Sequence, residues 1–365
     1  MTPAAPLRVL FLQQQPCVRA LKYAVGLAGQ VTLGFAYRGR TLSELYGAGD
    51  ELFDAWYRLG HDPAAALPGI LEEFAPDVIH SHNLPDELTA LALDETAGRI
   101  PVIHDVHDMQ SLRRTPYEDG FPEPADPLAL ERRAAEESDA VVTVSPELAE
   151  ALAARYRLPR RVVVYANYAL ACDLPRALPR ARARGGPPRI VYQGTLSANG
   201  GHYDLRELFT EIAAQGLSLD VYPARDATEY RSIRGIRLHE TLPAADLLRE
   251  LVDYDFGWAG FNAALNGPHL DTALPNKLFE YLACGLPVIT LGHRALRRML
   301  REEGLGIALD RVEDLASALA AADEGALRHR VAVARERFTV EHQIDRIAAL
   351  YREVAGAVAG EAVAG

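Results

Sequence analysis

Short runs of consecutive hydrophobic residues alternate along the chain with longer stretches of helical periodicity. Residues 8–12, 31–37, 77–80, 101–104 and 140–144 are strand-like runs, and amphipathic stretches lie between them. Continuous apolar runs of this length are typical of parallel strands that are covered on both faces. The pattern therefore predicts a doubly wound α/β domain whose connections are right-handed crossovers.

The same pattern restarts after a change in composition. Residues 172–188 are rich in Pro, Arg, Ala and Gly and lack apolar periodicity, which is typical of a linker. Strand-like runs and helical stretches then return. We predict two Rossmann-like, doubly wound domains that face each other across a cleft, over residues 1–171 and 189–340. Ligands of such sheets bind outside the carboxyl ends of the strands, so the cleft is the expected site.

Composition and charge narrow the classes of function. The 365 residues are 49% hydrophobic and 24% charged, which suits two globular domains and excludes extended disorder. The net charge of −12 repels polyanions, so we expect no nucleic-acid partner. No apolar stretch approaches the ~20 residues that span a bilayer. Cys17, Cys172 and Cys284 have neither metal spacing nor an even number, so we expect a cytoplasmic protein without a disulfide framework.

The strongest local signal lies just before a buried run in the second domain. Pro275 is suited to begin a helix, and Gly285 is suited to end it. The N–H groups of Asn276, Lys277 and Leu278 would then lie in the first turn, where the helix offers them no acceptor. Together with the helix dipole, these groups predict an anion-binding site.

Two charged side chains extend this prediction. Lys277 adds a full charge in the first turn, and Glu280 lies one turn further, placed to accept two hydrogen bonds from a ribose. Of 38 cationic side chains, all but Lys22 and Lys277 are arginines, which draws attention to both lysines. The segment predicts a nucleoside diphosphate ligand. The alternative is a plain helix–strand unit with a surface lysine and a solvated glutamate.

Residues 275–281, Pro-Asn-Lys-Leu-Phe-Glu-Tyr, resemble the donor-binding segment of family 4 retaining glycosyltransferases with the GT-B fold, in its Pro-x-Lys-x-x-Glu-Tyr variant. Segments 77–82 and 101–108 resemble N-terminal strands of that family. Segments 138–145 and 189–196 resemble its later strand-then-serine segment and the first strand and glycine loop of its donor domain. These similarities extend over most of the chain, and the segments occur in the same order as in the family.

The resemblance implies an enzyme that transfers a sugar from a nucleotide-diphosphate donor with retention of anomeric configuration. The acceptor would be a glycan, a lipid-linked molecule or a small molecule. The first domain would bind the acceptor and the second the donor, and the C-terminal helix 341–360 would pack back on the first domain. Neither a metal nor another cofactor is implied. No enzymatic nucleophile is evident, and the departing phosphate would serve as the base.

The resemblance also implies roles for single residues. His107 corresponds to the family's histidine beside the transferred sugar, and His104 is a rival for that position. Gly194 and Thr195 begin the loop that meets the diphosphate. Lys277 and the amides at the helix start would stabilise the charge on the leaving group.

The sequence departs from the family in two places. The first glutamate of the family's Glu-x7-Glu motif falls at Thr272, and the neighbouring Asp271 is the candidate substitute. The loop 195–202 has neither the arginine nor the lysine that usually meets the diphosphate. Lys277, the helix tip and backbone amides of the loop would have to neutralise the leaving group, with His202 helping if it is protonated.

Two alternatives therefore stay open. One is a non-catalytic partner subunit that binds nucleotide sugars, which the two departures favour. The other is a sugar-nucleotide epimerase or phosphorylase of the same fold. The sequence does not reveal the base, the sugar or the acceptor. Tyr222, Pro223 and His239, at later strand ends, are our candidates for the base pocket.

Other polar residues carry weaker signals. The spacing of His80 and His82 suggests a metal pair, but no third ligand follows at suitable spacing, so we expect both to line the cleft. Arg19 and Lys22 share a predicted helix face and would either hold an acidic acceptor group or be solvated.

The acceptor surface is expected on two loops, Arg38–Leu59 and Gln110–Asp126, the second of which contains Arg113 and Arg114. A further set of cations shares one predicted helix face, which would be solvated or would dock peripherally on an anionic membrane. These are Arg294, Arg297, Arg298 and Arg301.

Overall fold

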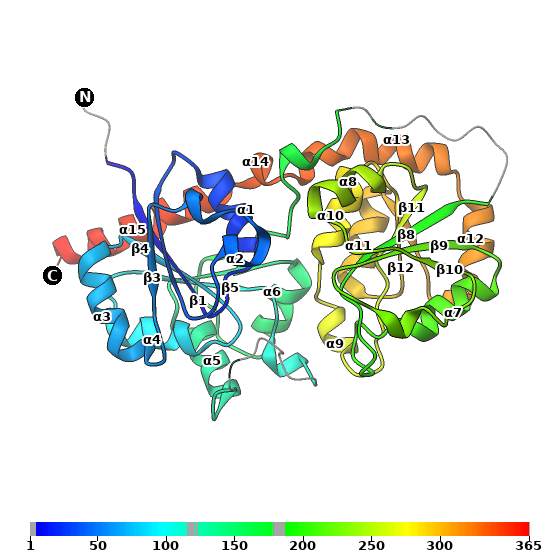
Figure 1. Cartoon of the computed structure of the whole chain (residues 1–365). Helices are drawn as coiled ribbons and strands as arrows, with labels where there is room; N and C mark the ends of the chain where they lie inside the picture. Colours follow the sequence, from blue (N-terminus) through cyan, green and yellow to red (C-terminus); the bar gives the residue numbers. More distant parts are fainter. Residues whose placement is uncertain (1–4, 115–120, 122, 177, 179–186, 365) are drawn as a thin grey trace. The chain divides into compact units, whose positions relative to one another are not determined.

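The computed structural model contains two parallel β-sheets, each flanked by helices (Figure 1). It describes residues 5–114, 121, 123–176, 178 and 187–364. The strand orders are β3-β2-β1-β4-β5-β6-β7 and β10-β9-β8-β11-β12-β13. The predicted fold class of two doubly wound α/β domains is confirmed. The strands are β1 Arg8–Gln13, β2 Thr32–Tyr37, β3 Ala55–Arg58, β4 Val78–His82, β5 Val102–Val106, β6 Ala140–Thr143, β7 Val162–Val164, β8 Arg189–Gly194, β9 Ser218–Pro223, β10 Ile236–Leu238, β11 Phe256–Trp258, β12 Val288–Thr290 and β13 Gly306–Ala308.

Several helices begin at capping side chains that the sequence supplies. Asp62, Asp126 and Ser145 accept hydrogen bonds from N–H groups in the first turns of α3, α5 and α6, and a proline follows each of them. The α-helices are α1 Val18–Leu27, α2 Leu42–Tyr46, α3 Pro63–Phe74, α4 Glu87–Thr96, α5 Pro127–Glu137, α6 Pro146–Ala153, α7 Arg206–Ala214, α8 Ala244–Leu251, α9 Gly267–Leu270, α10 Asn276–Ala283, α11 Arg294–Glu303, α12 Leu315–Ala321, α13 Glu324–Ala334, α14 Val340–Gln343 and α15 Asp345–Ala364.

The chain divides into two compact units. Unit 1 comprises Met1–Ser111, Pro116–Ala166 and Gln343–Gly365, and unit 2 comprises Leu112–Thr115 and Asn167–His342. Parts of two predicted segments lie outside the described residues. These parts are 115–120 and 122 in the loop expected over 110–126, and 177 and 179–186 in the expected linker.

In unit 1 the central strands are buried along their whole length, as their continuous apolar runs require. Every residue of β4, β5 and β6 is buried. The register sets His82 on β4 opposite Asp105 on β5, near the carboxyl ends of both strands. Helix α15 packs against β4, so the last helix of the chain completes the core of this unit.

The strands that the sequence pattern missed lie at sheet edges. Residues 38–59 were expected to form a loop, but they contain α2 and the edge strand β3. At one edge of the second sheet, the strand β13 was also not predicted. Both are short, and β3 ends in the exposed Arg58, so neither carries the long apolar run of a central strand.

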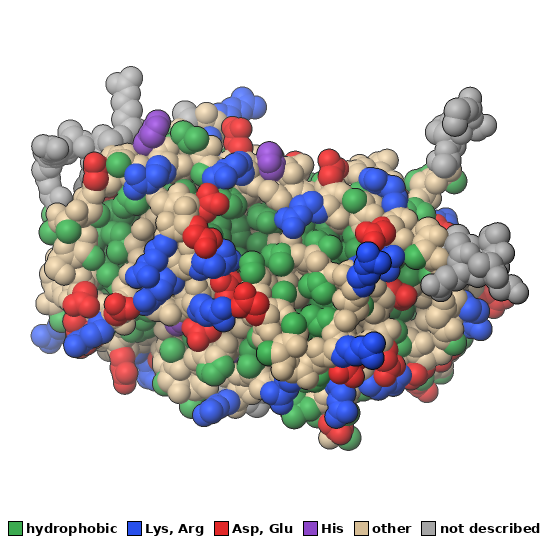
Figure 2. Space-filling view, turned by 180° about the vertical axis from the view of Figure 1, so that it is seen from behind, with side chains coloured by type: hydrophobic (Ala, Val, Ile, Leu, Met, Phe, Trp, Pro, Cys, Tyr) green, Lys and Arg blue, Asp and Glu red, His purple; other side chains and the backbone are tan. Residues whose placement is uncertain are grey.

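The molecular surface carries charges of both signs side by side. On the face drawn in Figure 2, Lys and Arg side chains lie among Asp and Glu side chains. On α11, Arg297 pairs with Asp310 at 2.5 Å and Arg298 with Glu302 at 2.8 Å. These pairs fit a solvated helix face. Within the described part of the chain, no helix is both long enough and apolar enough to cross a bilayer.

Candidate active site

Lys277 lies at the start of α10 with its ammonium buried in unit 2. The side chain is 6% exposed, and its Nζ lies 3.9 Å from the centre of the Tyr192 ring and 4.9 Å from that of Phe261. Among the described residues, none accepts a hydrogen bond from Nζ. Burial lowers the pKa of Lys277 to about 7, and the nearby Glu280 partly opposes that shift. This ammonium group is therefore placed for an anionic ligand.

The backbone at the end of β8 leaves room for that ammonium. Gly194 has φ +126, and a Cβ there would lie 3.2 Å from the Nζ of Lys277. A side chain at this position would therefore be strained and would crowd the lysine. The next residue, Thr195, accepts a hydrogen bond through its carbonyl from the Tyr192 hydroxyl at 2.5 Å.

The first turn of α10 differs in one respect from the prediction. The N–H of Leu278 was predicted to face an anion, but it donates to the carbonyl of Pro275 at 3.1 Å and is therefore not available to one. The tight turn at the N-cap Pro275 is the reason. Asn276 begins the helix, and the N–H of Lys277 in its first turn has no acceptor within the helix.

Glu280 lies one turn further along α10 and is held at the end of β8. Its carboxylate accepts a hydrogen bond from the side chain of Gln193, whose own backbone N–H donates to the Tyr281 hydroxyl at 2.9 Å. Glu280 is half-buried, which suits a carboxylate that binds sugar hydroxyls. Gln193 was not predicted as a site residue, although its position directly before Gly194 is a usable signal.

The candidate base-pocket residues lie around the ends of β9 and β10. Tyr222 is buried, stacks on the His239 ring at 4.2 Å and shares a hydrogen bond of 3.1 Å with the Tyr254 hydroxyl. Pro223 and His239 line a cavity of about 640 Å³ together with Arg237. Tyr222 therefore supports His239 from behind rather than lining the cavity.

Asp271 and Thr272, at the position of the missing glutamate, make structural contacts. The Asp271 carboxylate accepts a hydrogen bond from the N–H of Arg294 at 3.1 Å, and its carbonyl accepts one from Ala295 at 2.9 Å. Asp271 thus caps α11, although it also lines a cavity of about 410 Å³. The Thr272 hydroxyl donates to the carbonyl of His269 at 2.8 Å.

In unit 1, His107 follows the end of β5 and is 15% exposed. Its backbone N–H donates to the Asn83 side chain at 3.0 Å, so the residue after β4 fixes its position. The rival His104 is a core residue. Its ring contacts Thr89 at 3.3 Å and Asp86 at 3.5 Å, and burial lowers its pKa to about 3. Of the two, only His107 is partly exposed, so it is the better candidate for a contact with a ligand.

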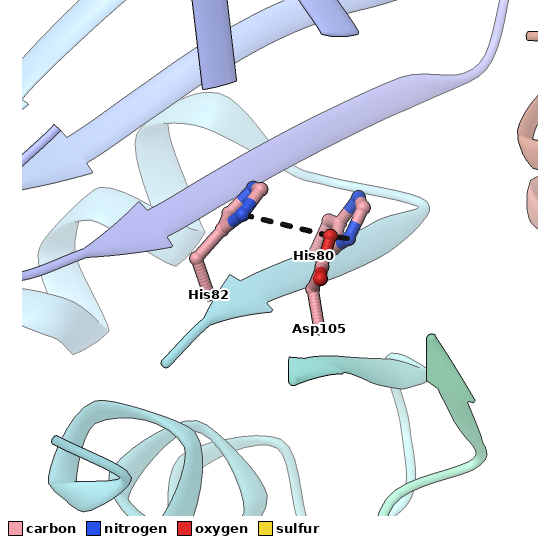
Figure 3. A group of neighbouring side chains, drawn as sticks. All are labelled: His80, His82 and Asp105. Atoms are coloured by element: carbon pink, nitrogen blue, oxygen red, sulfur yellow. Dashed lines mark hydrogen bonds and ion pairs between the residues drawn. The ribbon is translucent and has the colours of Figure 1, made fainter. Parts of the chain in front are cut away.

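His80, His82 and Asp105 form a fully buried cluster beneath this edge of the sheet (Figure 3). Each offers one ligand atom, and these atoms lie within 4.8 Å of one another. The expectation that His80 and His82 line the cleft is wrong, since both rings stack in the core at 4.6 Å. A third ligand is also present, but it comes from the neighbouring strand, where spacing along the sequence cannot reveal it.

The surroundings of Asp105 do not fit a metal ion. Its carboxylate accepts hydrogen bonds from Arg19 Nε at 3.1 Å, from the Tyr23 hydroxyl at 2.8 Å and from His80 Nε2 at 3.2 Å. Arg19 and Lys22 are themselves buried, so the expectation that their helix face is solvated is wrong. Arg19 is held by Asp105, so it does not serve as the group that was expected to hold an acidic acceptor. Arg19 already neutralises Asp105 and would repel a cation, so we interpret the cluster as an ion-pair network.

Two family models match the chain. The model described as Glycosyltransferase Family 4 matches residues 44–167, and the model described as Glucosyltransferase 3-like, C-terminal domain, matches residues 190–337. No curated protein matches the chain in sequence.

Solved structures share the fold at low identity. Sucrose-phosphate synthase from Thermosynechococcus elongatus has a TM-score of 0.68 and 14% identity, covering 96% of this chain and 100% of that chain. HepE from Anabaena in complex with UDP and glucose has a TM-score of 0.68 and 13% identity, covering 95% and 100%. The lipopolysaccharide outer core galactosyltransferase WaaB in its apo form has a TM-score of 0.66 and 11% identity, covering 95% and 100%. These similarities show the GT-B fold.

Removing the charge of Asp105 should destabilise unit 1 strongly. The Asp105→Asn variant leaves the buried Arg19 guanidinium uncompensated, and we expect a loss of about 3–5 kcal/mol in the free energy of unfolding. Burial alone would raise the pKa of Asp105, but the Arg19 guanidinium and the hydrogen bond from His80 outweigh it and hold that pKa well below its usual value. The difference in the free energy of unfolding between Asp105→Asn and the wild type should therefore become smaller as the pH falls below about 4.

Urea unfolding followed by circular dichroism measures this effect. Asp94→Asn is the matched control, because Asp94 pairs with Arg133 at 2.7 Å on the surface and its loss should cost about 1 kcal/mol or less. Equal losses in the two variants would contradict a structural role for the buried network.

Replacing Lys277 with methionine should stabilise the ligand-free protein. The pKa of Lys277 is about 7 in the folded chain and its ordinary value is 10.5, so the unfolded chain binds the proton more tightly. The loss of folding stability caused by burying the charged Lys277 is complete below pH 7 and decreases between pH 7 and about 10.5. Lys277→Met should therefore gain up to about 4 kcal/mol at pH 6 and little at pH 10.

Lys22→Met, at the other buried lysine, is the matched control. Unfolding midpoints at pH 6 and pH 10 give the comparison. A Lys277→Met variant that is less stable than wild type at pH 6 would show that the ammonium has a compensating partner within the protein.

Proposed function

We propose that this chain, which has the GT-B fold and matches a Glycosyltransferase Family 4 model over residues 44–167, is a glycosyltransferase of the family 4 type. We propose further that it transfers a sugar from a nucleoside diphosphate donor with retention of anomeric configuration. The observation that carries this proposal is the Lys277 ammonium, which is buried beside Gly194 without a hydrogen-bond acceptor among the described residues. A diphosphate supplies both the charge and the acceptors that this group lacks.

The surrounding residues support the same donor class. Glu280 lies one turn beyond Lys277 and is half-buried, so we assign it to the ribose hydroxyls. The cavity at Pro223 and His239 is our candidate for the base. HepE, which shares the fold, was solved with UDP and with UDP-glucose, and this supports a nucleotide-sugar donor here.

The proposed reaction is a substitution at the anomeric carbon. The bond from that carbon to the leaving phosphate oxygen breaks, and an acceptor oxygen bonds to the same face of the sugar. The acceptor's proton passes to the departing diphosphate, so the products are the glycosylated acceptor and a nucleoside diphosphate. Lys277 and the first-turn amides of α10 stabilise the negative charge that develops on the leaving group.

His107 is proposed to hydrogen-bond a hydroxyl of the transferred sugar. Its backbone is fixed by Asn83, and its side chain is partly exposed, unlike that of His104. We propose no metal, since Lys277 supplies the positive charge. We also propose a cytoplasmic site of action, because Cys17, Cys172 and Cys284 are free thiols. The acceptor is proposed to be a glycan, a lipid-linked molecule or a small molecule.

Nucleotide binding tests the donor site. Calorimetric titration with UDP, GDP, dTDP and ADP, in EDTA, should show that one of them binds to the wild type. Lys277→Met should weaken that binding about tenfold or more, and Lys22→Met should not. Wild-type affinity should fall as the pH rises above 7, by up to about tenfold per pH unit, because only protonated Lys277 attracts the diphosphate. Binding of none of the four would contradict the proposal.

The sugar conjugates of the bound nucleotide then separate enzyme from partner subunit. Slow hydrolysis of the donor, followed as release of the nucleoside diphosphate, is expected from a transferase. Tight binding with no hydrolysis and no transfer would favour the non-catalytic partner subunit instead. Nuclear magnetic resonance of the first sugar product gives the anomeric configuration.

His107→Ala should lower the rate of donor turnover about ten- to hundredfold while leaving the Kd of the nucleoside diphosphate unchanged, because the residue is assigned to the sugar. His61→Ala, at an exposed histidine of unit 1, is the control. A parallel loss of nucleotide affinity in His107→Ala would show that the residue acts on the nucleotide or on folding.

A further inference from the structure

The donor site has fewer cations than its proposed ligand requires. The loop 195–202 contains no lysine and no arginine. Lys277, with a pKa of about 7, carries only part of a charge at neutral pH before a ligand binds. A nucleoside diphosphate carries several negative charges, and more charge develops on it as the sugar leaves.

A short segment from elsewhere in the sequence belongs to unit 2 by its contacts. Leu112, Arg113 and Arg114 are grouped with unit 2, although the residues directly before them belong to unit 1. The backbone N–H of Arg114 donates to the Asn266 side-chain oxygen at 2.9 Å. Asn266 is fully buried, so this bond fixes the segment firmly against unit 2.

Asn266 connects this segment to the donor loop. Its side-chain nitrogen lies 3.2 Å from Nδ1 of His202, the last residue of the cation-free loop. The His202 ring packs against Phe261 with centroids 6.3 Å apart, and the Nζ of Lys277 lies 4.9 Å from the Phe261 ring. Contacts therefore run without a break from Arg114 to the buried ammonium.

The Arg114 side chain is available to a ligand. It is exposed, and within the described residues no carboxylate forms an ion pair with it. The arginines of α11 differ in this respect, since Arg297 and Arg298 pair with Asp310 and Glu302. Arginine also keeps its charge at any physiological pH and matches phosphate oxygens with a planar pair of donors.

We propose that Arg114 supplies the diphosphate-binding cation that the 195–202 loop lacks, and that Asn266 positions it through the backbone. The proposal rests on the proposed function and names a further residue for the same reaction. Arg114 would contact the phosphates of the donor, and Asn266 is a positioning residue.

Binding measurements with Arg114→Ala test this assignment. UDP, GDP, dTDP and ADP are titrated into the wild type and the variant, each beside its parent nucleoside and over a range of salt concentrations. We expect Arg114→Ala to weaken binding of the diphosphate about tenfold and to reduce its salt dependence, with nucleoside binding unchanged. Asn266→Ala should reproduce part of the loss of diphosphate affinity. The unfolding midpoint of this variant shows whether it remains folded.

Arg301→Ala, at an exposed arginine of α11, is the matched control. If the wild type binds a diphosphate and Arg114→Ala binds it equally well, the assignment of Arg114 is overturned while the proposed function stands. If the wild type binds none of the four diphosphates, both are overturned. If Arg114→Ala weakens the binding of the nucleoside and of the diphosphate equally, the assignment of Arg114 is also overturned, because the lost contact would not be with the phosphates.

Discussion

Parallel pairing is the constraint on which both units depend. Because all strands of each sheet run in one direction, their carboxyl ends meet at a single edge, and polar residues from distant parts of the sequence become neighbours there. In unit 1 this edge holds Asn83 and His107, and in unit 2 it holds Gly194. Crossover helices bury both faces of each sheet, so the edges are where polar chemistry is possible.

The two units bury charge in different ways. In unit 1, Arg19 and Asp105 are both buried and compensate each other within the protein, with tyrosine and histidine groups filling the remaining hydrogen-bonding positions. In unit 2, Lys277 is buried against aromatic rings and its hydrogen bonds are unmet within the described chain. The Arg19–Asp105 pair is compensated within the fold. The buried Lys277 lowers the stability of the ligand-free protein and leaves an ammonium group ready to bind an anion.

Local sequence patterns predicted the features that depend on neighbouring residues. The two doubly wound domains followed from central apolar runs, and α10 followed from Pro275 and Gly285. Features that depend on pairing between distant segments could not be predicted in this way. The register that sets His82 opposite Asp105, and the ion pair that buries Arg19, join residues that are far apart in the sequence.

The errors in the site have the same origin. Asp271 was considered as a substitute for the missing glutamate, but its carboxylate is held by the first turn of α11, a contact made across 23 residues. Leu278 was expected to offer its amide, and a tight turn at Pro275 uses it instead. Arg114 was noted only as part of a loop, because no pattern in the sequence connects it to Asn266.

The hydroxyl of Tyr351, on the last helix, forms a 2.6 Å hydrogen bond with His80 in the middle of β4. Both groups are fully buried, so the core of unit 1 includes a residue that the ribosome adds after the whole of unit 2. During synthesis, the first 166 residues emerge without the helix that covers β4. Unit 1 therefore reaches its final state only after unit 2 has left the ribosome, and the domain encoded first is completed last.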